Sequence, residues 1–166
     1  MAFVERQFSN NQINKAGTIL AQPDAFSLED HNWAADVLAN WRECHGHPIN
    51  TFQATPRAKL RNGYGPSIVA QRLKRAPSII SKLQRFQGMQ FARMQNIGGL
   101  RTVLQSVRQV RDLEDSYRTS AFAHVLTNSK NYIDEPKDDG YRGVHLIYRY
   151  KSDVAPAYDG LKMGST

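Results

Sequence analysis

Residues 67–86 read SIVAQRLKRAPSIISKLQRF, and this stretch predicts a β-strand that leads directly into an α-helix. The β-branched residues Ile68 and Val69 open a run that is typical of a strand. The run stops before Pro77, and proline is well tolerated at the first position of a helix because its missing N–H would have no partner there. The predicted buried stripe of this helix consists of Ile79, Ile80, Leu83 and Phe86.

Strands and helices alternate further along the chain. Residues 96–104 (NIGGLRTVL) predict a second strand, whose paired glycines allow close backbone approach. A helix over residues 106–118 and a third strand near 123–126 follow, and then a loop at 134–140. The clearest strand is 144–150 (VHLIYRY), because its side chains alternate with a period of two. Its two faces carry Val144, Leu146, Tyr148 and Tyr150 on one side and His145, Ile147 and Arg149 on the other.

The first 48 residues predict helices rather than strands. The best helix covers residues 27–43, with an apolar stripe at spacings of three and four that consists of Leu28, Trp33, Ala34, Val37, Leu38 and Trp41. We expect Pro48 to end this helical region. Residues 51–61 (TFQATPRAKLR) predict a second helix that is interrupted at Pro56.

A turn cluster at residues 62–66 (NGYGP) separates the two parts of the chain. Helices first, then strands alternating with helices, indicate an α+β domain in which helices flank a mixed β-sheet. We therefore divide the chain into an N-terminal helical leader, residues 1–66, and a sheet domain, residues 67–166.

The bulk composition favours one folded domain that attracts anions. The chain has 166 residues, 40% of them hydrophobic, and a formal net charge of +7. Nucleotides, nucleic acids and acidic membranes are the usual partners of such a surface. The single cysteine, Cys44, excludes an intrachain disulfide, and no signal peptide or apolar run of about 18 residues occurs. We expect a cytoplasmic protein.

Basic side chains gather around the strand and helix of residues 67–86. Arg72 and Lys74 lie two apart on the strand, and Ser78 and Lys82 lie four apart on the helix, so all four can converge. Cations and a hydroxyl at a helix N-terminus form a natural triphosphate site. The alternative is a solvated basic edge, since charge runs commonly are solvated faces.

These four residues resemble the R-x-K-x3-S-x3-K element of the RelA/SpoT synthetase family, and two further family elements follow in order. RMQNIGGLRTVL (residues 93–104) is similar to the family's D-I-x-G-x-R strand. SKNYIDEPKDDGYRGVH (residues 129–145) is similar to its K-D-Y-I-x2-P-K-x2-G-Y-x3-H acceptor loop. The leader segment NWRECHGHPINTFQ (residues 40–53) also resembles that of small single-domain members.

The resemblance implies a bacterial GTP or GDP pyrophosphokinase on a nucleotidyltransferase-like mixed sheet. Such a transferase moves the β,γ-pyrophosphate of ATP to the 3′-hydroxyl of a guanine nucleotide and makes (p)ppGpp, the alarmone of the stringent response. By resemblance, the ATP phosphates are bound by Arg72, Lys74, Ser78, Lys82 and Arg101. The acceptor nucleotide is expected at Lys130, Lys137, Tyr141 and Arg142, with the Tyr141 ring stacked on guanine. Arg101 and His145 are the expected catalytic residues.

The resemblance also implies Mg²⁺, but its ligand set is incomplete in this sequence. Asn96 stands where the family has a metal-binding aspartate, and Asn131 stands where it usually has another aspartate. The family's second ligand is a glutamate in a later E-x-Q-x-R strand, and we expect the chain to end at Thr166 before such a strand. A cluster of Cys44, His45 and His47 is better explained as a helix end than as a zinc site.

Several alternatives stay open at the level of sequence. The chain is either an incomplete copy of a working synthetase or a degenerate member that binds nucleotides without turnover. A third possibility is a tRNA 3′-end pyrophosphokinase, since a charge of +7 suits a polyanionic acceptor. A sheet edge left unpaired by a missing strand would favour homo-oligomers. No membrane partner is expected.

Overall fold

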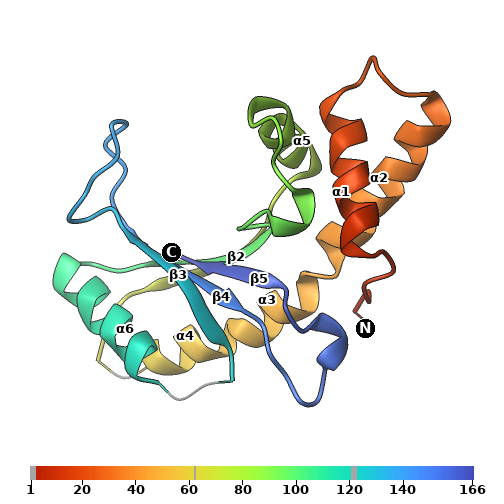
Figure 1. Ribbon diagram of the computed structural model, residues 1–166. Helices are drawn as coiled ribbons and strands as arrows, with labels where there is room; N and C mark the ends of the chain where they lie inside the picture. The colour runs from red at the N-terminus through yellow and green to blue at the C-terminus, as the bar shows by residue number, and fades with distance from the viewer. Residues whose placement is uncertain (1–2, 62, 121–122) are drawn as a thin grey trace.

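A five-stranded mixed sheet forms the centre of the molecule. The computed structural model describes residues 3–61, 63–120 and 123–166. The sheet has the strand order β1-β2-β5-β4-β3, in which β2 and β5 are parallel and all other neighbours are antiparallel (Figure 1). The strands are β1 (Ile68–Leu73), β2 (Gly98–Val103), β3 (Val125–Asn131), β4 (Val144–Arg149) and β5 (Lys162–Ser165). This architecture confirms the predicted α+β class.

One face of the sheet is covered by three helices. They are α3 (Gly46–Phe52), α4 (Ala54–Leu60) and α6 (Val107–Thr119), which lie together beneath the sheet in Figure 1. Their apolar side chains and the downward side chains of the strands form one core cluster, Ile49, Phe52, Leu60, Leu100, Leu113, Tyr117, Val144, Leu146, Tyr148 and Met163. The predicted alternation holds for Val144, Leu146 and Tyr148, which are all in this cluster, whereas Tyr150 lies beyond the end of β4 and belongs to the second core.

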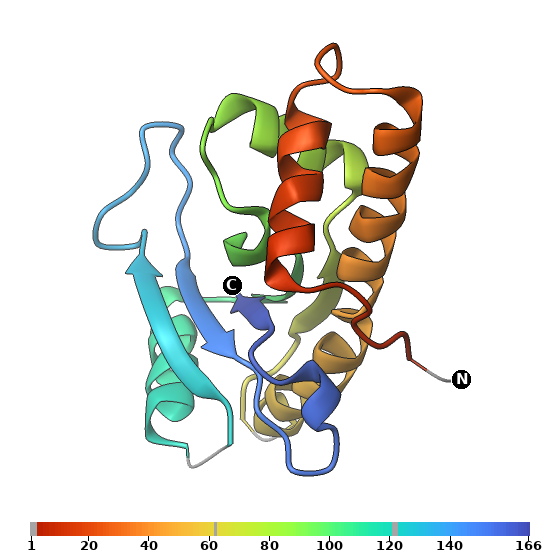
Figure 2. The same cartoon turned by 45° about the vertical axis from the view of Figure 1, so that its right-hand side comes forward.

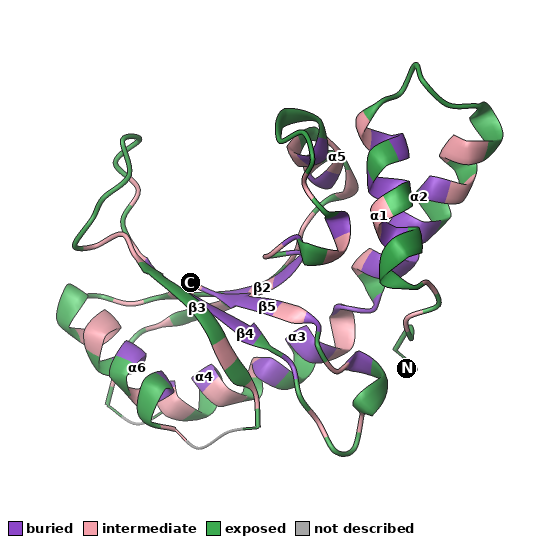
Figure 3. Cartoon of the chain, viewed as in Figure 1, coloured by how far each residue is buried: buried purple, intermediate pink, exposed green. Residues whose placement is uncertain are grey.

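A second core lies between the N-terminal helices and the helix that follows β1. The helices are α1 (Asn10–Ala21), α2 (Leu28–Glu43) and α5 (Ala76–Arg85), which pack side by side (Figure 2). The core between them is the purple region of these helices in Figure 3 and includes Ile13, Val37, Trp41, Ile79 and Leu83. The helices α1 and α2 begin at Ser9 and Ser27, each of which makes a capping box with the residue three positions later. Short 3₁₀ turns occur at Phe91–Arg93 and Pro156–Tyr158.

The paired glycines of β2 do allow the close approach that was predicted. A Cβ on Gly98 would lie 2.8 Å from the Ile49 side chain of α3. A Cβ on Gly99 would lie 3.0 Å from the carbonyl oxygen of Gly164 on β5. Side chains at these positions would therefore push both the covering helix and the neighbouring strand away from β2.

The structure corrects three expectations about the leader and the first helix of the sheet domain. Pro48 does not end a helix but lies in the first turn of α3, where a missing N–H breaks no intrahelical bond. Phe86 is 46% exposed, because α5 ends at Arg85 and Phe86 is already its C-cap. Leu28 is 78% exposed because it is the first residue of α2. Asn62 of the predicted turn lies outside the described residues.

The strand β5 was not predicted from the sequence. The absence of the family's E-x-Q-x-R motif led us to expect an unpaired sheet edge, whereas β5, which lacks this motif, lies in the interior of the sheet between β2 and β4. Its four residues, KMGS, are too few and too mixed to show a two-residue pattern. Two neighbouring strands supply its hydrogen-bond partners, so tertiary context outweighs its weak strand propensity. None of the described helices is long and apolar enough to cross a membrane.

Candidate functional site

The sheet face opposite α3, α4 and α6 carries several of the predicted site residues. Residues that pair across neighbouring strands point to the same face. Lys130 pairs with His145, and Arg101 pairs with Ala70, two positions before Arg72 on the same strand. The downward residues of these strands are those of the covered core. Arg72, Arg101, Lys130 and His145 therefore share the other face, which we call the open face.

The connection from β1 to α5 places Lys74 beside this face. The backbone N–H of Lys74 donates to the Ile97 carbonyl oxygen at 2.7 Å, although β1 formally ends at Leu73. The Arg42 Nε of α2 donates to the Lys74 carbonyl oxygen at 2.9 Å. These two bonds fix the chain just before α5. The first-turn N–H groups of a helix have no intrahelical partners, and no side chain caps α5 in the part of the chain that is described.

Positive charges crowd one another around Lys74 and Lys82. Partial burial lowers the pKa of Lys74, and the Arg72 and Arg85 guanidinium groups lower it further. Partial burial also lowers the pKa of Lys82, and the charges of Lys74, Arg85 and Lys130 add to this effect. Each named charge disfavours another positive charge, so a bound anion would relieve the repulsion. The group is therefore a concentration of positive charge that would attract an anion.

An aromatic cluster forms the other side of the open face, where the segment between β3 and β4 rises from the sheet. The Tyr141 hydroxyl and the His145 Nε2 are 2.9 Å apart, and the rings of Tyr132, Tyr141 and His145 meet edge to face. The Lys137 Nζ lies 4.6 Å from the Tyr132 ring centre and 5.2 Å from that of Tyr141. Gly143 permits this arrangement, because a Cβ there would lie 3.0 Å from the Tyr141 hydroxyl.

His145 is poised as a neutral imidazole. Burial lowers its pKa, and the positive charges of Lys137, Arg101 and Lys130 lower it further. Its usual pKa is already below 7, so the downward shift leaves the ring uncharged at neutral pH. A neutral ring retains one nitrogen lone pair and can accept a proton.

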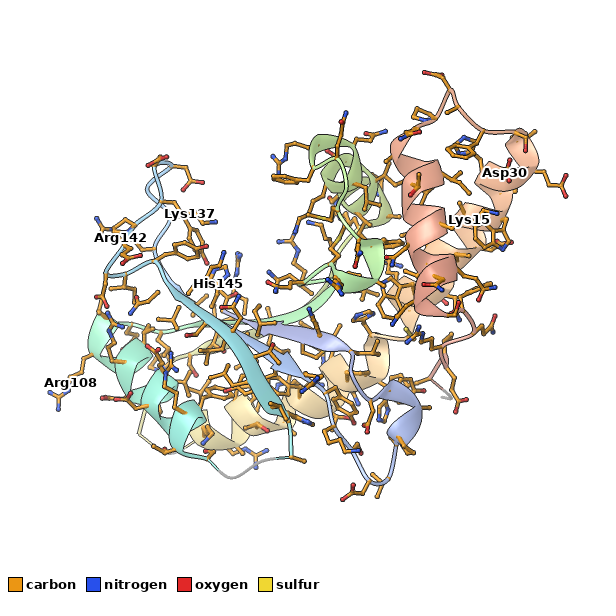
Figure 4. The ribbon with its side chains drawn as sticks, in the orientation of Figure 1. Lys15, Asp30, Arg108, Lys137, Arg142 and His145 are labelled. Carbon is orange, nitrogen blue, oxygen red and sulfur yellow. The ribbon has the colours of Figure 1, made fainter. Side chains whose placement is uncertain are left out.

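The structure brings most of the predicted residues to the open face, but not all of them. The charge of Lys130 acts on both Lys82 and His145, which links the β1–α5 side with the aromatic side. Figure 4 shows Lys137 and His145 on the inner side of the rising segment, whereas Arg142 lies on its outer side. The roles assigned to these residues stay predictions.

A cavity of about 330 Å³ is bounded by three of the predicted site residues, Arg101, Tyr141 and Arg142. It lies at the end of β5 on the α6 side of the sheet, and Arg142 is part of its wall. The other lining residues are Arg101, Thr102, Val103, Leu104, Val110, Leu113, Glu114, Tyr117, Tyr141, Gly143, Val144, Leu146, Ser165 and Thr166. Of the residues predicted for the acceptor, Tyr141 and Arg142 line this cavity, whereas Lys130 and Lys137 are not among its lining residues.

Asn131 has a structural role in the turn after β3. Its Oδ1 accepts from the backbone N–H of Ile133 at 3.0 Å, and its Nδ2 donates to Asp134 at 2.7 Å. Asp134 is also bound by Arg111 of α6. These bonds use the Asn131 amide to shape the loop, so it is not available as a metal ligand.

The residues at the expected Mg²⁺ position do not fit a hard divalent cation. Asn96 has a positive φ of 63°, which asparagine tolerates better than most residues. A Cβ on Gly164 of β5 would lie only 2.1 Å from Asn96 Oδ1, so the amide rests directly against the β5 backbone. Mg²⁺ prefers carboxylate oxygens. Within residues 3–61, 63–120 and 123–166, no group of three or more His, Cys, Asp or Glu residues could hold a metal.

The Cys44, His45 and His47 cluster is part of the packing at the end of α2. The Cys44 Sγ lies 3.2 Å from the Trp41 carbonyl oxygen, and His45 Nδ1 lies 2.7 Å from the same oxygen. Both side chains are buried, and burial lowers the pKa of His45 to about 4. The His47 ring instead stacks on Tyr158, 4.4 Å away.

Sequence reasoning missed three residues of the site. Arg85 acts on both Lys74 and Lys82, and its position three residues after Lys82 on the same helix was an available signal. Tyr132 completes the aromatic cluster, and its place next to Lys130 and Asn131 in the acceptor motif could have identified it. Gly164 had no signal, because only the structure shows that its strand lies against Asn96.

Comparison with solved structures shows which proteins share this fold. The fold matches small alarmone synthetase 1 of Bacillus subtilis, bound to its product pppGpp, with a TM-score of 0.63 and 20% identity over 73% of this chain and 66% of that one. It also matches small alarmone synthetase 2 of Bacillus subtilis, with a TM-score of 0.65 and 20% identity over 76% of this chain and 69% of that one. A GTP pyrophosphokinase family protein of Streptococcus pneumoniae matches with a TM-score of 0.62 and 23% identity over 84% and 70% of the two chains.

The match to a sequence family is more specific than the likeness in fold. Residues 71–157, more than half of the chain, match the model described as the region found in RelA / SpoT proteins. The chain belongs to the RelA/SpoT family, in agreement with the motif resemblance. It spans about two thirds of the length of the solved structures that it matches. No curated protein sequence matches it.

Proposed function

We propose that this protein is a pyrophosphokinase, which transfers the β,γ-pyrophosphate of ATP to the 3′-hydroxyl of a guanine nucleotide. The observation that carries the proposal is the position of Lys130 between two groups on one open face. Its charge acts on Lys82 of the cationic group at β1 and α5, and on His145 of the aromatic cluster. Donor and acceptor nucleotides bound at these two groups would meet above β5, next to Lys130.

The cationic group is suited to the ATP triphosphate. Arg72 can offer a guanidinium fork, whereas Lys74 and Lys82 offer ammonium groups that already repel each other. Ser78 lies in the first turn of α5, where backbone N–H groups lack intrahelical partners. The positive end of the helix dipole favours a phosphate there. These contacts would hold the three phosphates between β1 and α5.

The aromatic cluster is suited to the acceptor nucleotide. Tyr141 is only partly buried, and its ring makes edge-to-face contacts with the rings of His145 and Tyr132. A purine stacked on the Tyr141 ring would gain about 1–3 kcal/mol, as bases do on aromatic side chains. Lys137 lies beside the same ring and can bind the acceptor's phosphates. This geometry would place the ribose near His145 and Arg101.

The transfer step follows from these positions. The 3′-oxygen attacks the β-phosphorus, the bond from that phosphorus to the α,β-bridging oxygen breaks, and AMP leaves with the electron pair. His145, which is neutral at pH 7, accepts the proton of the 3′-hydroxyl. Arg101, whose charge acts on both Tyr141 and His145, stabilises the negative charge on the transferred group. Family members are expected to use Mg²⁺, but the residues here do not fit it, and no step is assigned to a metal.

The direct test is to incubate the purified protein with γ-labelled ATP and GDP or GTP, and to separate the nucleotides. We expect a labelled guanosine 3′-pyrophosphate and an equal amount of AMP. Tyr141→Ala should lose most of the product by weakening acceptor binding, whereas Arg108→Ala, on the outer side of α6 in Figure 4, should retain it. If no alarmone is formed even at high protein concentration, the proposed transfer is refuted.

A further inference from the structure

We infer that the site between β1 and α5 binds the nucleotide polyphosphate in its metal-free form and binds the magnesium complex less tightly. This inference rests on the proposed function for the identity of the ligand. The side chains of the site itself determine which ionic form of that ligand is preferred.

The first support is the sign of the charges around the phosphate position. The charges of Arg72, Arg85 and Lys130 act on Lys74 or Lys82, and Lys74 also acts on Lys82. Arg101, Lys130 and Lys137 act on the neighbouring His145 ring. The carboxylates of Asp134 and Glu114 pair with Arg111 and Arg118 on the α6 side, and the Asp139 carboxylate accepts from the backbone N–H of Tyr141. A free triphosphate meets this excess of positive charge with its full negative charge. Mg²⁺ removes two of those charges and weakens the attraction.

The second support is the contact between Asn96 and β5. The side chain at the expected metal position is the Asn96 amide, which carries no charge. Gly164 brings the β5 backbone so close that a side chain there would overlap Asn96 Oδ1, with its Cβ 2.1 Å away. A cation at this place would gain one amide oxygen at most from these two residues. Mg²⁺ in nucleotide sites is usually held by one or two carboxylates together with the phosphates.

The third support is the partial burial of the ammonium groups. Lys74 and Lys82 are each half-buried beside other cations, and burial and these charges lower the pKa of both. A phosphate oxygen would relieve this repulsion, whereas a phosphate-bound dication would add to it. The preference for the metal-free ligand thus arises from the same residues that make the site.

Isothermal titration calorimetry of the full chain with ATP tests the inference. One titration contains EDTA and the other contains excess MgCl₂, with the total ionic strength matched by KCl. We expect free ATP to bind about tenfold more tightly than its magnesium complex, a difference of about 1.4 kcal/mol. The affinity for free ATP should also fall more steeply as KCl is raised, because more charge is screened.

Asn96→Asp provides a second, nearly isosteric test. A carboxylate at this position repels free ATP and offers Mg²⁺ a charged ligand, so the ratio of the two Kd values should move about tenfold toward the magnesium complex. Arg108→Ala is the matched control, because it changes the net charge by the same amount on the outer side of α6 (Figure 4). It should leave the ratio unchanged.

The outcomes separate this inference from the proposed function. Equal or tighter binding of the magnesium complex overturns the inference and leaves a nucleotide site in place. An unchanged Kd ratio in Asn96→Asp also overturns it. Tight binding of free ATP without any labelled guanosine product supports the inference and contradicts the transfer. A chain that binds neither form, while its circular dichroism shows it to be folded, contradicts both.

Discussion

The two faces of the sheet differ in what surrounds them, although the same strands build both. On the covered face, Met163 of β5 and Phe52 of the covering helix α3 are almost fully buried. On the open face, exposed Arg101 and Lys130 lie among other cations. The period of two along each strand sends neighbouring residues to these opposite environments. Stability should therefore depend on one face and ligand binding on the other, and substitutions can test this separation.

The largest effect is expected on the covered face. Phe52 packs against the Tyr148 ring at 5.2 Å, and Phe52→Ala would leave a cavity beneath the sheet. We expect a loss of about 3–5 kcal/mol in the free energy of unfolding, measured by urea denaturation. Arg101→Ala on the open face is the comparison and should change stability by less than about 0.5 kcal/mol. Similar losses in both variants would show that the two faces are not separable.

A smaller effect on the covered side is expected from acid. Burial lowers the pKa of His45 to about 4, so the unfolded chain, with a histidine pKa near 6.5, binds more protons between these values. Stability therefore falls as pH is lowered through this range, by about 2 kcal/mol between pH 7 and pH 5. Urea denaturation at several pH values measures the slope. His45→Asn keeps a hydrogen-bond donor near the Trp41 carbonyl oxygen and should make the slope of stability against pH flatter. An equally steep slope in this variant would show that other groups cause the pH dependence.

On the open face, Lys82→Ala should weaken ATP binding without weakening the fold. The lost hydrogen bond to a charged phosphate predicts about a tenfold higher Kd, or about 1.4 kcal/mol, by calorimetry. The melting temperature should be unchanged or slightly higher, because Lys82 is repelled by Lys74 and Arg85. A variant that melts well below the wild type would instead give Lys82 a structural role.

The smallest effect distinguishes the half-buried His145 from the buried His45. The pKa of His145 is lowered first by burial and then by Lys137, Arg101 and Lys130, whereas burial alone lowers that of His45. Salt or bound nucleotide should therefore raise the pKa of His145 and leave that of His45 unchanged. NMR titration of the imidazole resonances measures both. Parallel shifts of the two residues would contradict a charge effect confined to the open face.

Some elements could be predicted from a regular spacing of apolar residues, whereas others depend on tertiary contacts. The helix α5 and the strand β4 follow from residues whose spacing matches one period over their whole length. The strand β5 does not, because its four residues depend on β2 and β4 for hydrogen bonds. Pro48 was misread because a proline ends one helix as readily as it begins another.

In the site, too, some features could be predicted from the sequence and others are shown only by the structure. The motif residues Arg72, Lys82 and His145 were found from spacing and family order. Their placement relative to one another depends on strand pairing, which a single sequence does not reveal. The contact between Gly164 and Asn96 joins residues far apart in the chain, so it was inaccessible before the structure.

The N-terminal helices are joined to the rest of the molecule by non-covalent contacts, one of which is the hydrogen bond from Arg42 to the Lys74 carbonyl oxygen. Apolar residues of α1 and α2 share one core with α5 and with Tyr150 and Leu161 near the C-terminus. A protease that cleaves the connection between α4 and β1 would therefore leave two pieces that stay associated and retain the nucleotide site. Neither piece should fold when it is expressed separately, and mixing the two should restore the structure.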